Sequence, residues 1–201
     1  MNTNDTITSK ADESRKGIAP RSLAGTLENE DGMTNKTAAV ASDVCRMLMR
    51  ELDGFRREVE MFPDDVSLWK VVPGITNSAG TLAIHVAGNL RWIGAVLGSS
   101  GYVRNRDAEF SRRGLTREEV KAELDRAKNE IEPTIRMLND AALAAPFPGD
   151  MHGMTMPTRR FLIAVEAHAA FHLGQASYIR RVVTGDATSS NPIETEPLSG
   201  A

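Results

Sequence analysis

Four long segments of the chain carry apolar residues at every third or fourth position, and this spacing constrains the fold more than any other feature. Such a spacing places apolar side chains along one face of an α-helix. The segments are residues 37–62, 78–97, 116–138 and 157–183 of a 201-residue chain. No long alternation of β-branched and polar residues is present. The sequence therefore predicts an all-α protein, most simply a four-helix bundle.

Local signals mark the ends of these predicted helices. Thr116 and Glu119 have the spacing of a capping box at the start of the third helix, and Ser78 is an N-cap candidate for the second. The connection between these two helices, residues 98–115, is long enough to cross the bundle. Residues 144–156 contain two prolines and two glycines, which predict a short hairpin or an irregular loop before the fourth helix.

Polar stretches flank the helical region. Residues 1–35 show no sustained apolar period and predict a disordered N-terminal tail. Residues 185–201 are again polar, include two prolines and predict a flexible C-terminal tail. The remaining residues, 36–184, are enough for one domain with its own core.

Composition excludes several classes of protein. The net charge of −3 provides no basic surface for nucleic acid, so no nucleic-acid partner is expected. No apolar run approaches the roughly 20 residues that span a bilayer, so no membrane association is expected, and the N-terminus lacks the apolar stretch of a secretory signal. Cys45 is the single cysteine, which rules out an intrachain disulfide and favours a cytoplasmic location. We expect it to be a small buried residue.

Three histidines lie on predicted apolar helix faces. His168 and His172 fall in the apolar stripe of the fourth helix, and His85 shares a face of the second helix with Leu82. Buried imidazoles cost free energy unless their nitrogens are satisfied. Side chains four residues apart on a helix lie about 5–6 Å apart at Cβ, so both histidines of the pair can reach one ion. We therefore predict a divalent metal held by His85, His168 and His172.

Simpler interpretations compete with the metal site. A single histidine on an apolar face is more often bonded to a neighbouring residue, and His85 alone would be interpreted in that way. A pair such as His168 and His172 also arises by chance on helix surfaces, but here no acidic residue shares its stripe. The fourth histidine, His152, lies in the Gly/Pro-rich loop, where we expect solvent exposure rather than a ligand.

The ligand pattern narrows the kind of metal site. The pair lacks the glutamate of the zinc-protease helix motif, and the Glu-x-x-His pairs of di-iron bundles are absent. Three imidazoles that leave a position for water or substrate are the ligand set of catalytic sites. Imidazole suits zinc, nickel, copper and iron, so the ligand set does not choose among them. We expect zinc or nickel, with manganese or iron as alternatives.

The histidine-bearing helices and the connection between them carry a set of short motifs. In one-letter code these are LW at 68–69, PG at 73–74, NSAGTL at 77–82, GNL at 88–90, GYVRNRDAEFS at 101–111 and HAAFHLGQA at 168–176. As a set they resemble the DinB-like superfamily of metal-binding four-helix bundles, which includes YfiT-like proteins and bacterial thiol transferases. The resemblance covers residues 37–184.

This resemblance implies a crossing connection between the second and third helices. It also implies a divalent metal held by one histidine of the second helix and a His-x-x-x-His pair of the fourth, positions that match His85, His168 and His172. A homodimer is implied as well. Some members transfer low-molecular-weight thiols such as bacillithiol or mycothiol, and many have no known activity. Family membership therefore supports fold and metal more strongly than chemistry.

The first functional hypothesis is a metal-dependent thiol transferase. A divalent ion lowers the pKa of a bound thiol, so that a small-molecule thiol is presented as a nucleophile to an electrophilic substrate. Asn89, Gln175 and Arg104 are candidates to orient substrate or water. Their structural alternatives are buried amides for the first two, and for Arg104 an ion pair with Asp107 or Glu109.

Two other functions use the same histidines. One is a metal-binding or stress-related protein without turnover. A lined pocket beside the metal would favour catalysis over this role, whereas a metal sealed by side chains would favour a structural one. The other is a metal-dependent hydrolase, which ranks lower because the histidine-bearing stripes carry no carboxylate to act as general base.

Overall fold

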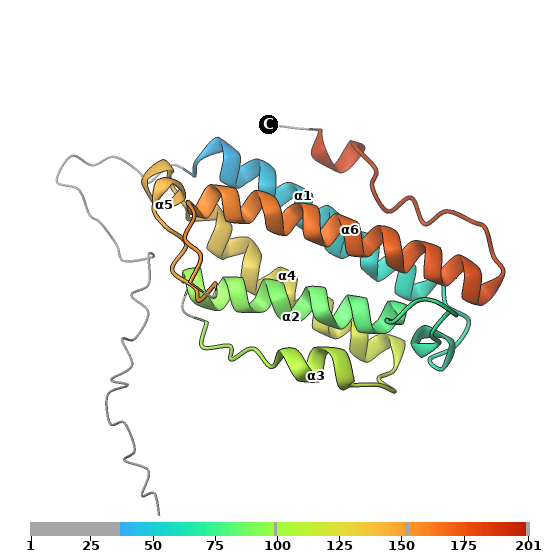
Figure 1. Cartoon of the computed structure of the whole chain (residues 1–201). Helices are drawn as coiled ribbons and strands as arrows, with labels where there is room; N and C mark the ends of the chain where they lie inside the picture. Colours follow the sequence, from blue (N-terminus) through green and yellow to red (C-terminus); the bar gives the residue numbers. More distant parts are fainter. Residues whose placement is uncertain (1–36, 99, 152, 200–201) are drawn as a thin grey trace, which may run out of the picture.

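A computed structural model describes residues 37–98, 100–151 and 153–199. These residues form an all-helical bundle without β-strands, which confirms the predicted fold class (Figure 1). The long helices are α1 (Ala39–Glu60), α2 (Ala79–Gly98), α4 (Arg117–Arg136) and α6 (Thr158–Thr184). The short ones are α3 (Arg106–Ser111), α5 (Asp140–Ala144) and the 3-10 helices η1 (Ser67–Trp69) and η2 (Glu196–Leu198). The predictions for residues 1–35 and for His152 lie outside the described residues.

The long helices surround one apolar core. Helix α2 packs against α4 and α6, and α1 packs against the same two helices. The chain leaves α2 at one end of the bundle and returns through α3 to start α4 at the other end, so α2 and α4 run in the same direction (Figure 1). The predicted crossing connection is therefore present. Among the described residues, no helix is both long and apolar enough to cross a membrane.

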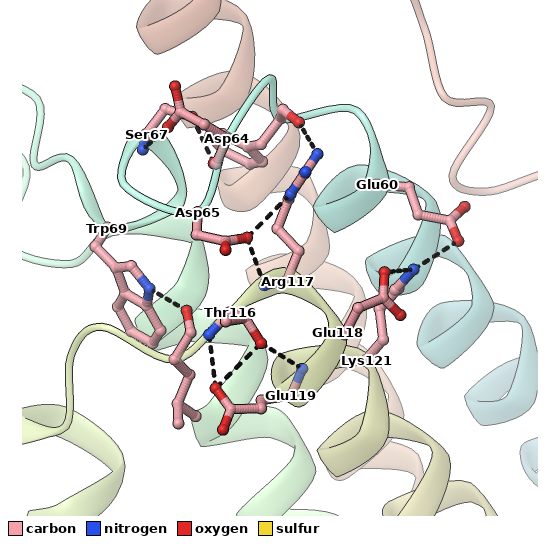
Figure 2. Close-up of polar contacts among 12 residues, drawn as sticks. Glu60, Asp64, Asp65, Ser67, Trp69, Thr116, Arg117, Glu118, Glu119 and Lys121 are labelled. Carbon is pink, nitrogen blue, oxygen red and sulfur yellow. Dashed lines mark hydrogen bonds and ion pairs between the residues drawn. The ribbon is translucent and has the colours of Figure 1, made fainter.

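The crossing connection between α2 and α4, called the crossover below, is held at its C-terminal end against the loop that precedes α2 (Figure 2). The predicted capping box is formed, with Thr116 and Glu119 each bonding to the backbone of the other. One residue earlier, the carbonyl of Leu115 accepts a hydrogen bond from Trp69 Nε1 at 2.8 Å. Arg117 donates through Nε to Asp65 Oδ1 at 3.2 Å. These contacts hold the segment that follows α3 against the α1–α2 loop.

The loop before α6 adopts a narrow, hairpin-like form without regular strands. A single antiparallel bridge pairs Pro146 with Pro157. Beside it, the Phe147 N–H donates to the carbonyl of Met156 at 3.0 Å. The structure thus combines the two alternatives predicted for residues 144–156, a hairpin closure and an irregular loop.

The apolar stripe of α6 differs in register from the predicted one. The prediction placed Phe161, Val165, His168, His172, Ala176, Ile179 and Val183 in the core. The buried apolar residues are instead Leu162, Val165, Ala169, Leu173, Ala176 and Ile179. Both sets step by threes and fours, so helical periodicity alone does not choose between them. The two histidines consequently lie half-buried at the edge of the core.

The segment after α6 returns along the bundle and packs on α1 (Figure 1). Arg180 is fully buried and donates through Nε to Glu58 Oε2 at 2.5 Å and through Nη2 to the carbonyl of Thr188 at 2.5 Å. Ser190 Oγ donates to the other oxygen of Glu58, also at 2.5 Å. A Cβ at position 54 would lie 2.8 Å from the carbonyl oxygen of Pro192, so Gly54 permits this close approach. The predicted tail, residues 185–201, thus makes specific contacts with α1 from within its described residues.

The buried ion pair between Arg180 and Glu58 predicts a non-additive loss of stability. Arg180→Met leaves the Glu58 carboxylate buried without its cation, which should lower the free energy of unfolding by about 3–5 kcal/mol. The double variant Arg180→Met/Glu58→Met removes both charges and should be more stable than the single variant. Urea denaturation followed by circular dichroism measures both values. A double variant less stable than the single variant would contradict this account.

Candidate metal centre

The three predicted ligand histidines meet where α2, α3 and α6 come together. Their candidate ligand nitrogens all lie within 4.8 Å of one another. The Nε2 atoms of His85 and His168 are 3.1 Å apart, and the ring centroids of His168 and His172 are 4.3 Å apart. An ion held tetrahedrally about 2.0–2.1 Å from each nitrogen separates two ligand atoms by roughly 3.3 Å. The three imidazoles could therefore hold one metal ion.

The orientation of His85 is set by a buried carboxylate from the crossover. His85 Nδ1–H donates to Glu109 Oε2 at 2.9 Å, which leaves Nε2 available as a ligand. Arg104 donates to both oxygens of Glu109, at 2.8 and 2.9 Å. Although burial raises the pKa of Glu109, the hydrogen bonds from His85 and Arg104 lower it overall. An ionised carboxylate behind a histidine is a common second partner of metal-binding imidazoles.

The other two imidazoles are held neutral. Burial, followed by the neighbouring His172 and His85, lowers the pKa of His168 to about 4. Burial also lowers the pKa of His172, against a smaller opposing effect of its hydrogen bond to Gln175. In that bond, His172 Nδ1–H donates to Gln175 Oε1 at 2.7 Å. Both rings are thus neutral at pH 7, the state in which imidazole binds metal, and Nε2 of His172 is left free.

Gly88 allows Glu109 to reach α2. It lies one helical turn after His85, and a Cβ at this position would be 2.4 Å from Glu109 Oε1. Any side chain at position 88 would therefore push the carboxylate away from His85. The close approach of α3 to α2 depends on this missing side chain.

A pocket of about 860 Å³ lies next to His172; none of the three histidines lines it, but two of its lining residues contact His172. Its walls come from residues 72–77, which precede α2, and from the face of α6 that includes Phe171, Gln175 and Tyr178. Gln175 bonds to His172, and the Phe171 ring lies 5.5 Å from the His172 ring. The candidate metal centre is therefore bordered by an open pocket.

Comparison with known protein families assigns the chain to one family. Residues 42–195 match the model of a family described as "Protein of unknown function (DUF1572)". The chain belongs to this family. No curated protein and no solved structure matches the chain significantly. The DUF1572 match begins within α1, covers α2, α4 and α6, and continues past residue 184 into the segment that packs on α1.

The three predicted substrate-orienting residues have different surroundings in this DUF1572 chain. Arg104 pairs with Glu109, which was its predicted alternative. Gln175 contacts His172 and also lines the pocket. The buried Oδ1 of Asn89 has no hydrogen-bond partner among the described residues, so its oxygen is not bonded to backbone there. Cys45 is buried in the core as expected, and burial raises the pKa of its thiol.

Glu109 is the site residue that the sequence did not identify. It lies on α3, a helix of six residues, which is too short to show an apolar period. Two signals were available. The first is Asn105, a residue type favoured at helix N-caps, which does cap α3 by accepting a hydrogen bond from the Ala108 N–H at 2.9 Å. The second is Gly88, a glycine inside a predicted helix one turn after His85, where a close approach by another segment is a common reason for glycine.

Gly88→Ala should weaken metal binding without unfolding the bundle. The added methyl displaces Glu109 from His85, and loss of such a partner typically costs about 10- to 100-fold in metal affinity. Gly174→Ala is the matched control, because a Cβ at this other helical glycine meets nothing within 4 Å. Competition titration of zinc against a chromophoric chelator measures both affinities. Equal affinities for Gly88→Ala and wild type would show that Glu109 does not support the site.

Proposed function

We propose that this protein binds one divalent transition metal through Nε2 of His85, His168 and His172 and uses it to transfer a low-molecular-weight thiol to an electrophilic substrate. The observation that carries the proposal is the convergence of three imidazoles beside an open pocket. A purely structural metal is usually enclosed by four protein ligands, whereas three ligands leave a position for substrate. Zinc or nickel is expected in this site, with manganese or iron as alternatives.

The source of the nucleophile follows from the residues of the chain. Cys45 is the single cysteine and is buried in α1, so the protein supplies no thiolate of its own at the site. A divalent ion in this position would lower the pKa of a small-molecule thiol and favour its thiolate at neutral pH. The sulfur then forms a bond to the electrophilic carbon, the S–H proton passes to solvent, and the displaced group leaves with the electrons of the broken bond.

Three side chains have roles in the proposal. Glu109 holds the His85 ring in place and is itself held by Arg104. Because both of its oxygens are engaged, it is a poor general base, which disfavours a hydrolase. Asn89 lies one turn after His85, and its unpartnered Oδ1 would accept a hydrogen bond from bound water or substrate.

Metal content tests the first half of the proposal. Untagged protein purified without chelator should contain about one transition metal per chain by plasma mass spectrometry, a ratio set by a single three-ligand site. His85→Ala and His168→Ala should both lose it. His152→Ala, a change at the remaining histidine of the chain, serves as the matched control and should retain it. A wild-type protein that stays metal-free after incubation with zinc, nickel and manganese would contradict the site.

A thiol-conjugation screen tests the second half. The metal-loaded protein is incubated with bacillithiol, mycothiol or glutathione and a chromogenic electrophile such as 1-chloro-2,4-dinitrobenzene, and product is measured by absorbance. We expect turnover with at least one thiol and a loss of at least 100-fold in His168→Ala, because removing a ligand removes the thiol-activating ion. No turnover with any thiol by a protein that does bind metal would leave a metal-binding protein without transferase activity.

A further inference from the structure

We infer that the pocket between residues 72–77 and α6 binds the uncharged, apolar body of the electrophilic substrate and directs its reactive end toward His172. This inference rests on the proposed function for the identity of the reactive end. The pocket itself follows from the described residues. Its volume of about 860 Å³ falls within the range of small-molecule sites, which is roughly 300–1,000 Å³.

The lining of the pocket selects for apolar ligands. Val72, Pro73 and Ile75 form one wall, and Phe171, Tyr178 and Val182 form the other. No residue that lines it carries a charge. The polar groups are few, and include the side chains of Thr76, Asn77 and Gln175. This combination, apolar walls with a few polar groups, is typical of sites that bind neutral organic molecules.

Large apolar side chains of the pocket are exposed in the structure. Phe171 is 61% exposed, Tyr178 is 71% exposed and Val182 is 64% exposed. They lie on one face of α6 at spacings of seven and four residues, with Gly174 and Gln175 between the first two. Contiguous exposed apolar surface of this kind usually marks a binding site. A ligand in the pocket would cover it.

The pocket adjoins His172 through two of its lining residues. Gln175 lines the pocket and accepts the hydrogen bond of His172 Nδ1. Phe171 also lines the pocket and stacks at an angle beside the His172 ring. A molecule whose apolar body occupies the pocket therefore places one end next to His172.

Gly174 provides a way to fill the pocket. It lines the pocket, and a Cβ at this position meets nothing within 4 Å. Gly174→Leu therefore starts a side chain into the pocket from a Cβ that meets no neighbour, and replacing a helical glycine also favours the helix. Ala164→Leu is the matched control, because Ala164 is exposed on the same helix and lies outside the pocket.

The first experiment uses the uncharged fluorescent probe N-phenyl-1-naphthylamine with the full chain, with and without added zinc. Wild type and Ala164→Leu should bind the probe saturably, and Gly174→Leu should bind it at least tenfold more weakly. Absence of saturable binding to wild type would overturn the inference. Light scattering accompanies the titration. A wild-type dimer that becomes a monomer in Gly174→Leu, together with no probe binding, would assign this face to contacts between copies of the chain.

The second experiment links the pocket to the metal. Zinc-loaded protein is titrated by calorimetry with n-alkyl hydroxamates from acetohydroxamate to octanohydroxamate, whose head group binds metal and whose tail would enter the pocket. Affinity should rise about fourfold for each added CH₂ in wild type and should be independent of chain length in Gly174→Leu. Acetohydroxamate binding without any dependence on chain length would overturn the inference. If no hydroxamate binds, the proposed metal function fails, and the probe titration still decides whether the pocket takes apolar ligands.

Discussion

The buried carboxylate of Glu109 is the interaction on which the candidate site depends. A buried charge is costly unless it is paired and hydrogen-bonded, and here Arg104 and His85 together satisfy both oxygens. Because Glu109 belongs to the crossover and His85 to α2, the same contact docks α3 and selects the tautomer of the histidine. It forms only because Gly88 leaves room for it. Backbone packing and ligand orientation are therefore consequences of one contact.

The position of His168 and His172 at the edge of the core explains why their pKa values are lowered. His168 and His172 lie on α6 beside the buried stripe rather than within it. This placement desolvates the rings enough to keep them neutral, and it leaves His172 in contact with Phe171 and Gln175, which line the pocket. A full core position would have sealed the imidazoles, and a surface position would have left them with ordinary pKa values and no defined orientation.

The long helices could be predicted from the sequence because they depend on local periodicity, and the three histidines could be identified from their spacing and from the family resemblance. The start of α4 was marked by Thr116 and Glu119, and the described bounds of the long helices lie within about two residues of those predicted. The register of α6 was wrong, because two adjacent stripes fit the same period. Glu109 was missed because it reaches the site from a six-residue helix whose position depends on tertiary contacts. The role of Arg180 in holding the last segment was equally invisible, since a buried ion pair leaves no periodic pattern.

Helix α6 makes two different sets of contacts on two of its sides. Residues 185–199 contribute acceptors and a hydroxyl donor to the Arg180–Glu58 pair, on the side of α6 that faces α1. The histidines use the side of α6 that faces α2. One helix thus carries a buried ion pair on one face and the candidate metal centre on the other. Substitutions around the candidate metal centre can therefore change its ligands or the adjacent pocket without disturbing the Arg180–Glu58 contacts that hold the last segment on α1.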